Sequence, residues 1–371
     1  MNHHRKFDVV VRDGFAGYCV SQIRKALSEM VDLAGGWPKA VQPEARVLLK
    51  VNMLSAKDPD KAITTHPAVV AAVASLLREK GCSVDIGDSP GGAVRGIQRY
   101  WDNCGFSFAA ELSGAGLVNF EASGSRKVSV RGREYDIALP VVEGYDCRIN
   151  LSKFKTHSYT RITNSVKNAF GIVPGFGKAM LHAISPRPKD LAVAIADLYE
   201  AAAFDLNVTD GILAIDRRGP GTDGRRRHEG FLALSRNGFQ LDMALSEMAG
   251  LPWQELEYCS EGVRRGLAGP PGSFTVHGNH LFKDFEIPGP SYLNRIPRWL
   301  GAVARRLMRI SPSSNSKCTG CGVCARACPV HAIEIRKQRA VMKKGICIMC
   351  LCCHEMCPDN AVEIKLPLGL G

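Results

Sequence analysis

Apolar positions near the N-terminus change their period along the chain, from strand to helix and back to strand. Residues 7–12 and 45–51 are short β-rich runs, and apolar residues recur at helical spacing between them. These helical positions are Val20, Ile23, Leu27, Met30 and Val31. A helix between two strands is therefore expected as the first unit, and its short joints favour a parallel sheet with right-handed crossovers.

The same pattern then repeats. Pro67 stands at the first position of a second apolar helical period, Gly81 ends that period, and residues 83–87 form the next β-rich run. Further strands are expected at 146–151 and 205–209, helices near 160–170, 189–203 and 240–250, and a hairpin or β-excursion over 115–139. We therefore predict an α/β fold with an open, mainly parallel sheet and flanking helices.

A change in composition near residue 287 predicts a domain boundary. Pro and Gly interrupt the chain at 287–290, and a polar run covers 311–316. We expect an α/β domain over 1–286, a linker over 287–316 and a small, cysteine-rich α+β domain over 317–371. Within the linker, 293–310 combines an apolar helical stripe with five arginines. Such a helix either docks the small domain onto the large one, which we favour, or contacts a membrane surface.

Eight of the fourteen cysteines form two copies of the spacing C-x2-C-x2-C-x3-C-P, which is typical of bacterial ferredoxins. The fourth cysteine of each copy lies on a following helical turn, so we expect it to bind the other of two [4Fe–4S] clusters. This assigns Cys318, Cys321, Cys324 and Cys357 to one cluster, and Cys347, Cys350, Cys353 and Cys328 to the second. A disulfide scaffold needs a secreted chain and zinc sites use paired cysteines, so both alternatives are disfavoured.

Charge and hydropathy narrow the class of protein further. The formal net charge is +12, and the mean hydropathy is −0.07, without an apolar run long enough to span a membrane or an N-terminal signal region. Because cluster thiolates need a reducing compartment, we expect a cytoplasmic protein. Residues 313–371 hold eight Lys or Arg and four Asp or Glu. This excess suits an acidic external electron donor such as a ferredoxin or flavodoxin, and a basic surface without consequence is an equal alternative.

A run of five arginines between residues 217 and 227 is a second basic feature. These are Arg217, Arg218, Arg225, Arg226 and Arg227. The run is short and glycine-rich and has no interleaved aromatic residue, so it favours a solvated loop over a nucleic-acid site.

Polar residues and glycines follow the predicted strand ends. The turn 87–92 (Gly-Asp-Ser-Pro-Gly-Gly) follows one strand, and its amides are expected to form an anion-binding nest, although a plain turn would look similar. Lys50 and Asn52 follow the preceding strand, and the polar stretch 150–157 leaves a third. On the helix expected over 160–170, Thr160, Asn164, Lys167 and Asn168 would share one face. Carboxyl ends of parallel strands meet at one edge, so these groups should line one cleft.

This cleft should attract anions, because residues 150–182 hold no acidic side chain. The glycine-rich run 171–178 is a candidate lid. The residues expected to bind the ligand are Lys50, Asn52, Gly87, Asp88, Ser89, Gly91, Lys153, Asn168 and Lys178. Lys153, Lys155 and Lys167 are expected to clamp the reacting anion, with His157 or His182 as the proton donor.

Seven motifs in order resemble the family called domain of unknown function 362, over residues 7–285. They are Lys50-Val51-Asn52, Thr65-His66-Pro67, the turn 87–91, the stretch 150–157, the stretch 166–171, Asp210-Gly211 and Gly219-Pro220-Gly221. The C-terminal part resembles a dicluster ferredoxin, a fusion common in that family, whose reaction is not generally assigned. The Gly-Asp-Ser-Pro turn alone is also similar to lactate-racemase-like proteins that bind a phosphorylated cofactor.

Two functions fit these features. In the first, two [4Fe–4S] clusters deliver electrons to an anionic small molecule or phosphorylated cofactor at the lysine-rich edge. In the second, the protein is a non-catalytic electron relay whose α/β domain docks a partner protein. A recessed pocket with buried lysines close to a cluster would favour the first function, and a flat, wet surface would favour the second.

Overall fold

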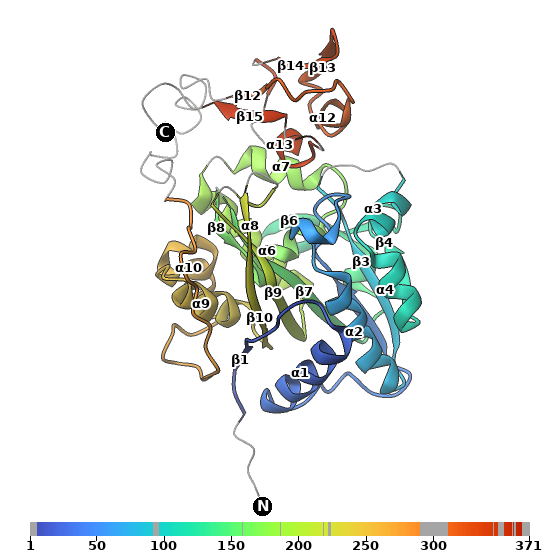
Figure 1. The fold of residues 1–371 in the computed structure, drawn as a ribbon, viewed down its shortest axis with the longest axis vertical. Coiled ribbons are helices and arrows are strands. Elements are labelled where there is room, and N and C mark those ends of the chain that lie inside the picture. Colours follow the sequence, from blue (N-terminus) through green and yellow to red (C-terminus); the bar gives the residue numbers. More distant parts are fainter. Residues whose placement is uncertain are drawn as a thin grey trace, which may run out of the picture.

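A computed structural model shows a large α/β part and a small cysteine-rich part that lies over one end of its sheet (Figure 1). The structure describes residues 6–91, 96–157, 159–185, 187–217, 219–221, 224–289, 311–343, 345–347, 352–357, 359 and 361–365. No helix in the described ranges is both long and apolar enough to cross a membrane.

The large part is built on one mixed sheet, which has nine strands among the described residues. The strand order is β11-β1-β10-β9-β7-β2-β3-β4, and β8 pairs with β7 outside this path. The strands are β1 (Val9–Arg12), β2 (Arg46–Lys50), β3 (Ser83–Asp88), β4 (Gly116–Asn119), β7 (Cys147–His157), β8 (Arg161–Thr163), β9 (Leu206–Arg217), β10 (Gly224–Ser235) and β11 (Val276–His277). From β9 to β4 the neighbours are parallel, whereas β10 is antiparallel to both β9 and β1.

Helices cover both faces of the sheet. One face carries α1 (Val20–Leu33), α2 (Pro67–Glu79) and α4 (Phe106–Ser113), and the other carries α8 (Pro188–Ala202), α9 (Gly238–Met248) and α10 (Glu257–Arg264). Shorter helices are α3 (Gln98–Asn103), α5 (Leu139–Val142), α6 (Ser165–Asn168), α7 (Gly177–Ile184), η1 (Pro59–Lys61), η2 (Ala169–Ile172) and η3 (Trp253–Glu255). Alternate residues of β2 serve the two faces: Leu49 packs with Leu27 and Val73 on one, and Leu48 packs in the core on the other.

The small part is made of two short antiparallel sheets and two short helices. Strand β12 (Ser311–Ser314) pairs with β15 (Val362–Lys365), and β13 (Ile333–Arg336) pairs with β14 (Arg339–Met342). The helices are α12 (Val323–Arg326) and α13 (Cys352–Glu355). Ala327 and Met356 are buried in the same apolar core as α1 and α2, so the small part packs directly on the large one.

The structure confirms the predicted α/β class and the α2–β3 unit, because β2 and β3 are adjacent and parallel. The first predicted unit is wrong in one respect. Strand β1 is not a neighbour of β2, since β10, β9 and β7 lie between them. The apolar run of β1 pairs with β10, more than two hundred residues later, and helical period alone carries no information about such a partner.

Two predicted elements differ around residue 160. Strand β7 continues to His157, so the polar stretch 150–157 is strand and not the loop after it. The helix expected over 160–170 is replaced by β8, by α6 and by η2. Thr160 and Asn164 therefore do not lie on a helix with Lys167. Polar residues in β7 are buried and paired, which a period-2 apolar search does not detect.

The remaining expectations concern the excursion and the linker. Strands β5 (Ser125–Val130) and β6 (Arg133–Ala138) form the expected hairpin, while β4, also within that range, is an edge strand of the main sheet. The helix expected over 293–310 lies outside the described residues. Strand β12 starts at Ser311, inside the predicted linker, so the small part begins earlier than residue 317.

Candidate functional site

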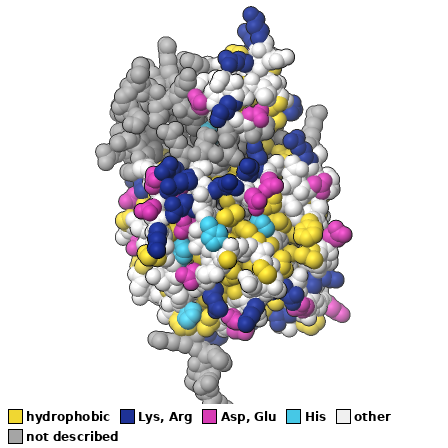
Figure 2. Space-filling model, in the orientation of Figure 1, with side chains coloured by type: hydrophobic (Ala, Val, Ile, Leu, Met, Phe, Trp, Pro, Cys, Tyr) yellow, Lys and Arg dark blue, Asp and Glu magenta, His cyan; other side chains and the backbone are white. Residues whose placement is uncertain are grey.

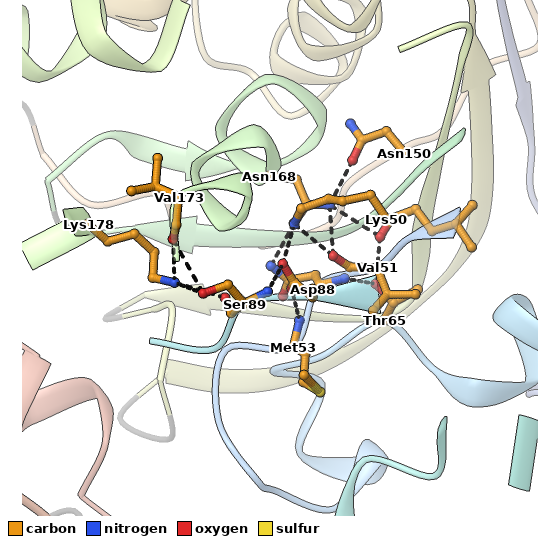
Figure 3. A network of polar contacts seen from close by, with 12 residues as sticks. Lys50, Val51, Met53, Thr65, Asp88, Ser89, Asn150, Asn168, Val173 and Lys178 are labelled. Atoms are coloured by element: carbon orange, nitrogen blue, oxygen red, sulfur yellow. Dashed lines mark hydrogen bonds and ion pairs between the residues drawn. The ribbon is translucent and has the colours of Figure 1, made fainter. Parts of the chain in front are cut away.

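A buried ion pair joins the ends of two neighbouring strands. Lys50 ends β2 and Asp88 ends β3, and their Nζ and Oδ1 atoms lie 2.8 Å apart with almost no exposure (Figure 3). The carboxylate also accepts the Met53 amide at 2.7 Å and the Ser89 amide at 2.8 Å, while Lys50 donates to Asn168 Oδ1 at 3.2 Å. Burial lowers the pKa of Lys50 and raises that of Asp88, and each partner opposes the shift of the other.

Gly171 allows a second chain segment to approach this pair. A Cβ at this position would overlap Asp88 Oδ1 and would lie 2.6 Å from Lys50 Nζ. The Gly171 carbonyl accepts the Ser89 amide at 3.3 Å, so the backbone itself is in contact with the turn after β3. This close approach places α6, with Lys167 and Asn168, beside the strand ends.

The turn after β3 contributes side chains and not the predicted anion-binding nest. Its Ser89 amide donates to Asp88 and Gly171, and its Gly91 amide donates to Leu54 O at 2.9 Å. These N–H groups are therefore satisfied within the protein, which is the ordinary state of buried backbone groups. The Ser89 side chain, by contrast, lines the pocket described below.

A hydrogen-bonded chain of three side chains borders the turn. Lys178, in the first turn of α7, donates to the Ser89 hydroxyl and to Val173 O at 2.9 Å, as Figure 3 shows. The Ser89 hydroxyl donates to Glu121, whose Oε1 lies 4.0 Å from Lys178 Nζ. Glu121 also accepts the Gly175 amide at 3.1 Å. The run 171–178, expected to be a mobile lid, is instead held by these bonds and by η2 and the start of α7.

A pocket opens between the strand ends, α6, α7 and α13. Its lining residues are Lys50, Asn52, Met53, Leu54, Asp88, Ser89, Gly91, Lys155, Thr163, Lys167, Asn168, Phe170, Gly171, Lys178, Ala179, His182, Pro220 and Cys352. Four lysines and one carboxylate are among them. The pocket therefore carries a positive charge next to apolar walls, which suits an anionic ligand with an apolar body.

Two of these lining side chains have contrasting polar surroundings. Lys155 Nζ donates to Asn52 Oδ1 at 2.7 Å and to the Ile63 carbonyl, and the side chain is almost fully buried. Thr163 is also buried, but its hydroxyl has no hydrogen-bond partner among the described residues. A buried polar atom without a partner costs stability, so a ligand or water that reached Thr163 would be stabilised by it.

The two predicted proton donors lie at different places. His182 lines the pocket, but His157 does not. The His157 Nδ1 atom accepts the Tyr159 amide at 3.0 Å, and its buried Nε2 has no partner among the described residues. Burial, with the nearby charge of Lys167, lowers the pKa of His157 well below its usual value and that of His182 to about 3. Both imidazoles are therefore neutral near pH 7.

Lys153 belongs to a different cluster. Its ammonium lies 2.8 Å from Asp210 Oδ2 and 2.8 Å from the Tyr18 hydroxyl, and it is not among the pocket-lining residues. The Tyr18 ring stacks on His66 at a centroid distance of 3.4 Å. This arrangement satisfies all of the buried charges internally, so Lys153 acts in packing β7 against β9 and not in the predicted ligand site.

The arginine run on β9 and β10 is largely neutralised by acidic partners. Arg225 pairs with Asp216, Arg227 with Glu229, and Arg217 with Glu286. On the face seen in Figure 2, acidic side chains are interspersed with the basic ones. The loop prediction is wrong for Arg217 and for residues 225–227, because Arg217 ends β9 and residues 225–227 belong to β10. Their acidic partners nevertheless disfavour a nucleic-acid surface.

Four cysteines of the small part surround a second, smaller pocket. The thiols of Cys318, Cys321, Cys324 and Cys357 line it, so the last cysteine of the second motif joins the first triplet. No three His, Cys, Asp or Glu side chains in the described ranges converge closely enough to bind a single metal ion. Gly320 has φ +69° and lies against the Gln338 backbone, so only glycine fits this loop.

Backbone amides point at three of the cysteine sulfurs. Ala340 N lies 3.4 Å from Cys318 Sγ, and the amides four residues after Cys328 and Cys357 each lie 3.1 Å from the sulfur before them. Such N–H···S bonds stabilise the negative charge of cluster thiolates. The four cysteines around the smaller pocket therefore fit a [4Fe–4S] cluster.

The second predicted set is described only in part. Cys328 and Cys353 are buried in the core of the small part with Cys347 beside them, whereas Cys350 lies outside the described residues. Cys352 has a different environment from its neighbour Cys353, because it lines the lysine-rich pocket of the large part. The ligation of the second cluster stays a prediction.

Sequence reasoning missed several pocket residues. Thr163 and Pro220 line the pocket and come from segments distant in the chain. Glu121, which does not line the pocket but accepts a hydrogen bond from Ser89, follows β4 in a loop without a recognisable motif. Cys352 is not one of the eight cysteines in the two spacings, and no sequence signal indicates that it faces the large part. Only long-range packing brings these residues to the strand ends.

The fold and the cysteine pocket together define an iron–sulfur protein with a large α/β part. Residues 47–247 match the family described as domain of unknown function (DUF362), and residues 314–334 match the 4Fe-4S binding domain. A thylakoid-associated protein of Synechocystis sp. is 31% identical over 265 residues, which are 71% of this chain and 81% of that protein. The chain belongs to the DUF362 family and carries a 4Fe-4S binding domain.

Similarity to solved structures is weaker. A protein of Thermotoga maritima aligns with TM-score 0.38 and 14% identity over 55% of this chain and 52% of its own length. The lactate racemase apoprotein of Thermoanaerobacterium thermosaccharolyticum aligns with TM-score 0.40 and 11% identity over 58% of this chain and 52% of its own. The chain thus spans about half the length of each of these structures.

Proposed function

We propose that this protein is an iron–sulfur reductase in which two [4Fe–4S] clusters deliver electrons to an anionic small molecule in the lysine-rich pocket. The observation that carries the proposal is the position of Cys352. Its side chain lines the same pocket as Lys50, Lys155 and Lys178, while the next residue, Cys353, is a predicted cluster ligand. One wall of the ligand pocket is therefore part of a cluster-binding loop.

The charge of the pocket supports an anionic substrate. Lys178 is directed into it from α7 and Lys167 from α6, and Asp88, the carboxylate on the wall, is already paired with Lys50. Ammonium groups in a recessed site bind carboxylates and phosphates by charge-assisted hydrogen bonds. The apolar walls formed by Met53 and Phe170 suit a ligand with an apolar portion, such as an organic acid or the phosphate ester of one.

The clusters supply one electron each, which suits a two-electron reduction. Cys318, Cys321, Cys324 and Cys357 would hold one of them, and Cys328, Cys347, Cys350 and Cys353 the other. The external electron donor or acceptor would be an acidic protein, a ferredoxin or flavodoxin, attracted to the basic residues of the small part. A reducing compartment such as the cytoplasm fits this chemistry. The Synechocystis relative is named as a thylakoid-associated protein, which supports a peripheral membrane contact as a further part of the proposal.

The alternative is an electron relay whose α/β part docks a partner protein. That function calls for a flat and wet surface at the strand ends. The recessed pocket and its nearly unexposed Lys50, Lys155 and Lys178 favour a small ligand instead.

Anion binding tests the proposal, and Lys167 is the best residue to change. Lys167 lines the pocket and is half-buried. Lys155 also lines the pocket, but it donates hydrogen bonds to Asn52 and to the Ile63 carbonyl, so replacing Lys155 would disturb the fold. We expect anaerobically purified protein to bind inorganic phosphate or small carboxylates in calorimetry. Lys167→Ala should weaken that binding roughly 10-fold or more, since a hydrogen bond to a charged group contributes about 1.5–3 kcal/mol.

Lys127→Ala is the matched control, because Lys127 is an exposed lysine on the β5–β6 hairpin. Its variant should bind anions like the wild type, and both variants should keep their iron. Mass spectrometry of small molecules released from the purified protein would identify the natural ligand class. Absence of anion binding in the wild type, or equal binding by the two variants, would count against the reductase and for the relay.

A further inference from the structure

Lys178 lies between the ligand pocket and the cysteine-rich part. Its side chain is 9% exposed, and its ammonium donates to Ser89 O at 3.1 Å, to Val173 O at 2.9 Å and to the Ser89 hydroxyl. Cys352 of α13 lines the same pocket, and Figure 1 shows α7 directly beneath α13. A charge on Lys178 is therefore close both to the bound ligand and to a cluster-binding loop.

Ser89 connects Lys178 to the ligand space. Its hydroxyl accepts a hydrogen bond from Lys178, donates one to Glu121 and lines the pocket. A bound anion that competes with Glu121 for this hydroxyl would receive its hydrogen bond directly. The hydrogen bonds of the structure lead from Lys178 through Ser89 to Glu121, and they become a short proton path to the pocket when an anion replaces Glu121 as the acceptor.

The surroundings of Lys178 bring its titration close to neutral pH. Burial lowers its pKa and outweighs the opposing charges of Glu121, Asp88 and Cys352, while Lys50 lowers it further, so that the pKa is about 8. An ordinary lysine, with a pKa of about 10.4, releases its proton too reluctantly to serve as an acid at pH 7. His182, on the pocket wall, is a neutral imidazole and therefore has no imidazolium proton to donate.

We propose that Lys178 is the proton source of the site and that Ser89 passes its proton to the bound anion. This assignment rests on the proposed reduction. It moves the role that the sequence assigned to His157 or His182 onto the lysine between the cluster loop and the pocket.

Reduction of the anion would consume two protons and two electrons, which the clusters would supply. The Ser89 O–H bond breaks as a new bond to hydrogen forms on the reduced anion, and a Lys178 N–H proton restores the hydroxyl. Lys178 is then a neutral amine, which takes up a proton from water. An external one-electron donor reduces the clusters again, and the second proton follows the same route.

Lys178 shares the pocket with Cys352, whose neighbour Cys353 is a predicted cluster ligand, so the protonation of Lys178 would make the potential of that cluster depend on pH. The charged ammonium stabilises the extra electron, so the cluster is easier to reduce while Lys178 is protonated. As pH rises and the amine loses its proton, the reduction potential should fall.

Redox titration of the intact, cluster-loaded protein from about pH 6 to about pH 10, followed by electron paramagnetic resonance, tests this link. In the wild type we expect the potential of one cluster to fall as pH rises, by at most about 59 mV per pH unit, the equivalent of a tenfold change for one electron. Lys178→Arg keeps its charge and should show no slope. Lys178→Met should also show none, at a lower potential. Glu121→Gln should move the titration to lower pH, because Glu121 raises the pKa of Lys178.

The outcomes separate this proposal from the reductase itself. The role of Lys178 would be overturned if the cluster potential still fell with pH in Lys178→Met. It would also be overturned if the potentials of both clusters were independent of pH in the wild type. Anion binding at one fixed pH tests the reductase independently. A protein that binds anions but lacks the pH dependence of the potential loses only the Lys178 assignment. A protein with that pH dependence but no anion site loses the reduction and, with it, Lys178 as the proton source.

Discussion

Individual residues at the strand ends divide into those that build the site and those that face its ligand. The Lys50–Asp88 pair builds it, because each charge is fully used by protein partners. Removing one member would leave the other charge buried and unpaired, at a cost of about 3–5 kcal/mol. Lys167 and Ser89 face the pocket. The sequence predicted that all four gather at one edge, but it could not separate these roles, which depend on neighbours distant in the chain.

The neighbouring cysteines Cys352 and Cys353 provide a test at the scale of one residue. Cys353 is buried with the other cluster cysteines, whereas Cys352 faces the lysine-rich pocket. Cys353→Ser should lose one of two clusters, which is about half of the iron and acid-labile sulfide, because the serine oxygen is a poorer ligand for iron. Cys352→Ser should keep about eight irons per chain.

Iron and sulfide analysis of anaerobic preparations measures this difference directly. The wild type should show absorbance that dithionite bleaches. Equal iron in the two variants, or a wild type with a single cluster, would show that the assignment of the second motif is wrong.

At the scale of elements, a buried carboxylate fixes the position of α6. Asp242 on α9 accepts Asn164 Nδ2 and the Ser165 amide at 2.9 Å, and the Val166 amide at 3.1 Å. Asp242 belongs to none of the motifs found in the sequence. Its partners are Asn164, between β8 and α6, and the first two residues of α6. The helical period over 160–170 does not reveal this break between β8 and α6.

Asp242→Asn should loosen α6 without affecting the clusters. One acceptor oxygen becomes an amide donor that faces N–H groups, which costs about 1–3 kcal/mol. Amide hydrogen exchange at residues 165–168 should therefore accelerate about 10-fold or more, while iron content stays constant. Glu247→Gln on the same helix is the control, since Glu247 accepts a single bond at the surface. Unchanged exchange in Asp242→Asn would show that α6 is held by other contacts.

Asp242 also makes the stability of the protein depend on pH, and the direction of this dependence follows from its pKa. Burial raises the pKa of Asp242 from the usual range to about 7, so folding favours its protonated form. The contribution to stability is then largest at low pH and is lost as pH rises through about 7. In Asp242→Asn this component of the pH dependence of exchange at α6 should be absent.

At the scale of the whole molecule, the sequence predicted the two parts and the sheet class, but it assigned their contact to the helix expected over 293–310, which lies outside the described residues, and not to Ala327 and Met356. Cysteine spacing is local, and so is the helical period of α2, so both could be recognised directly. The place of β1 beside β10 and of Met356 in the core of the large part depends on residues far away in the chain. No local pattern specifies such contacts.

Met356 joins the parts where the cluster loop meets the pocket. It is 7% exposed in the core shared with α1 and α2, and its sulfur lies 3.4 Å from where a Cβ of Gly91 would be. Met356→Gln preserves the size and the neutrality of the side chain, but it buries an amide for which the site provides no hydrogen-bond partner among the described residues. This costs about 1–3 kcal/mol of stability. We expect faster amide exchange in 352–356 and 89–91 with unchanged iron, and a weaker effect of bound phosphate on the cluster potentials. The exposed Val341→Gln on β14 should change neither quantity. If Met356→Gln behaves like this control, the two parts are held together by other contacts and the pocket is not coupled to the clusters through α13.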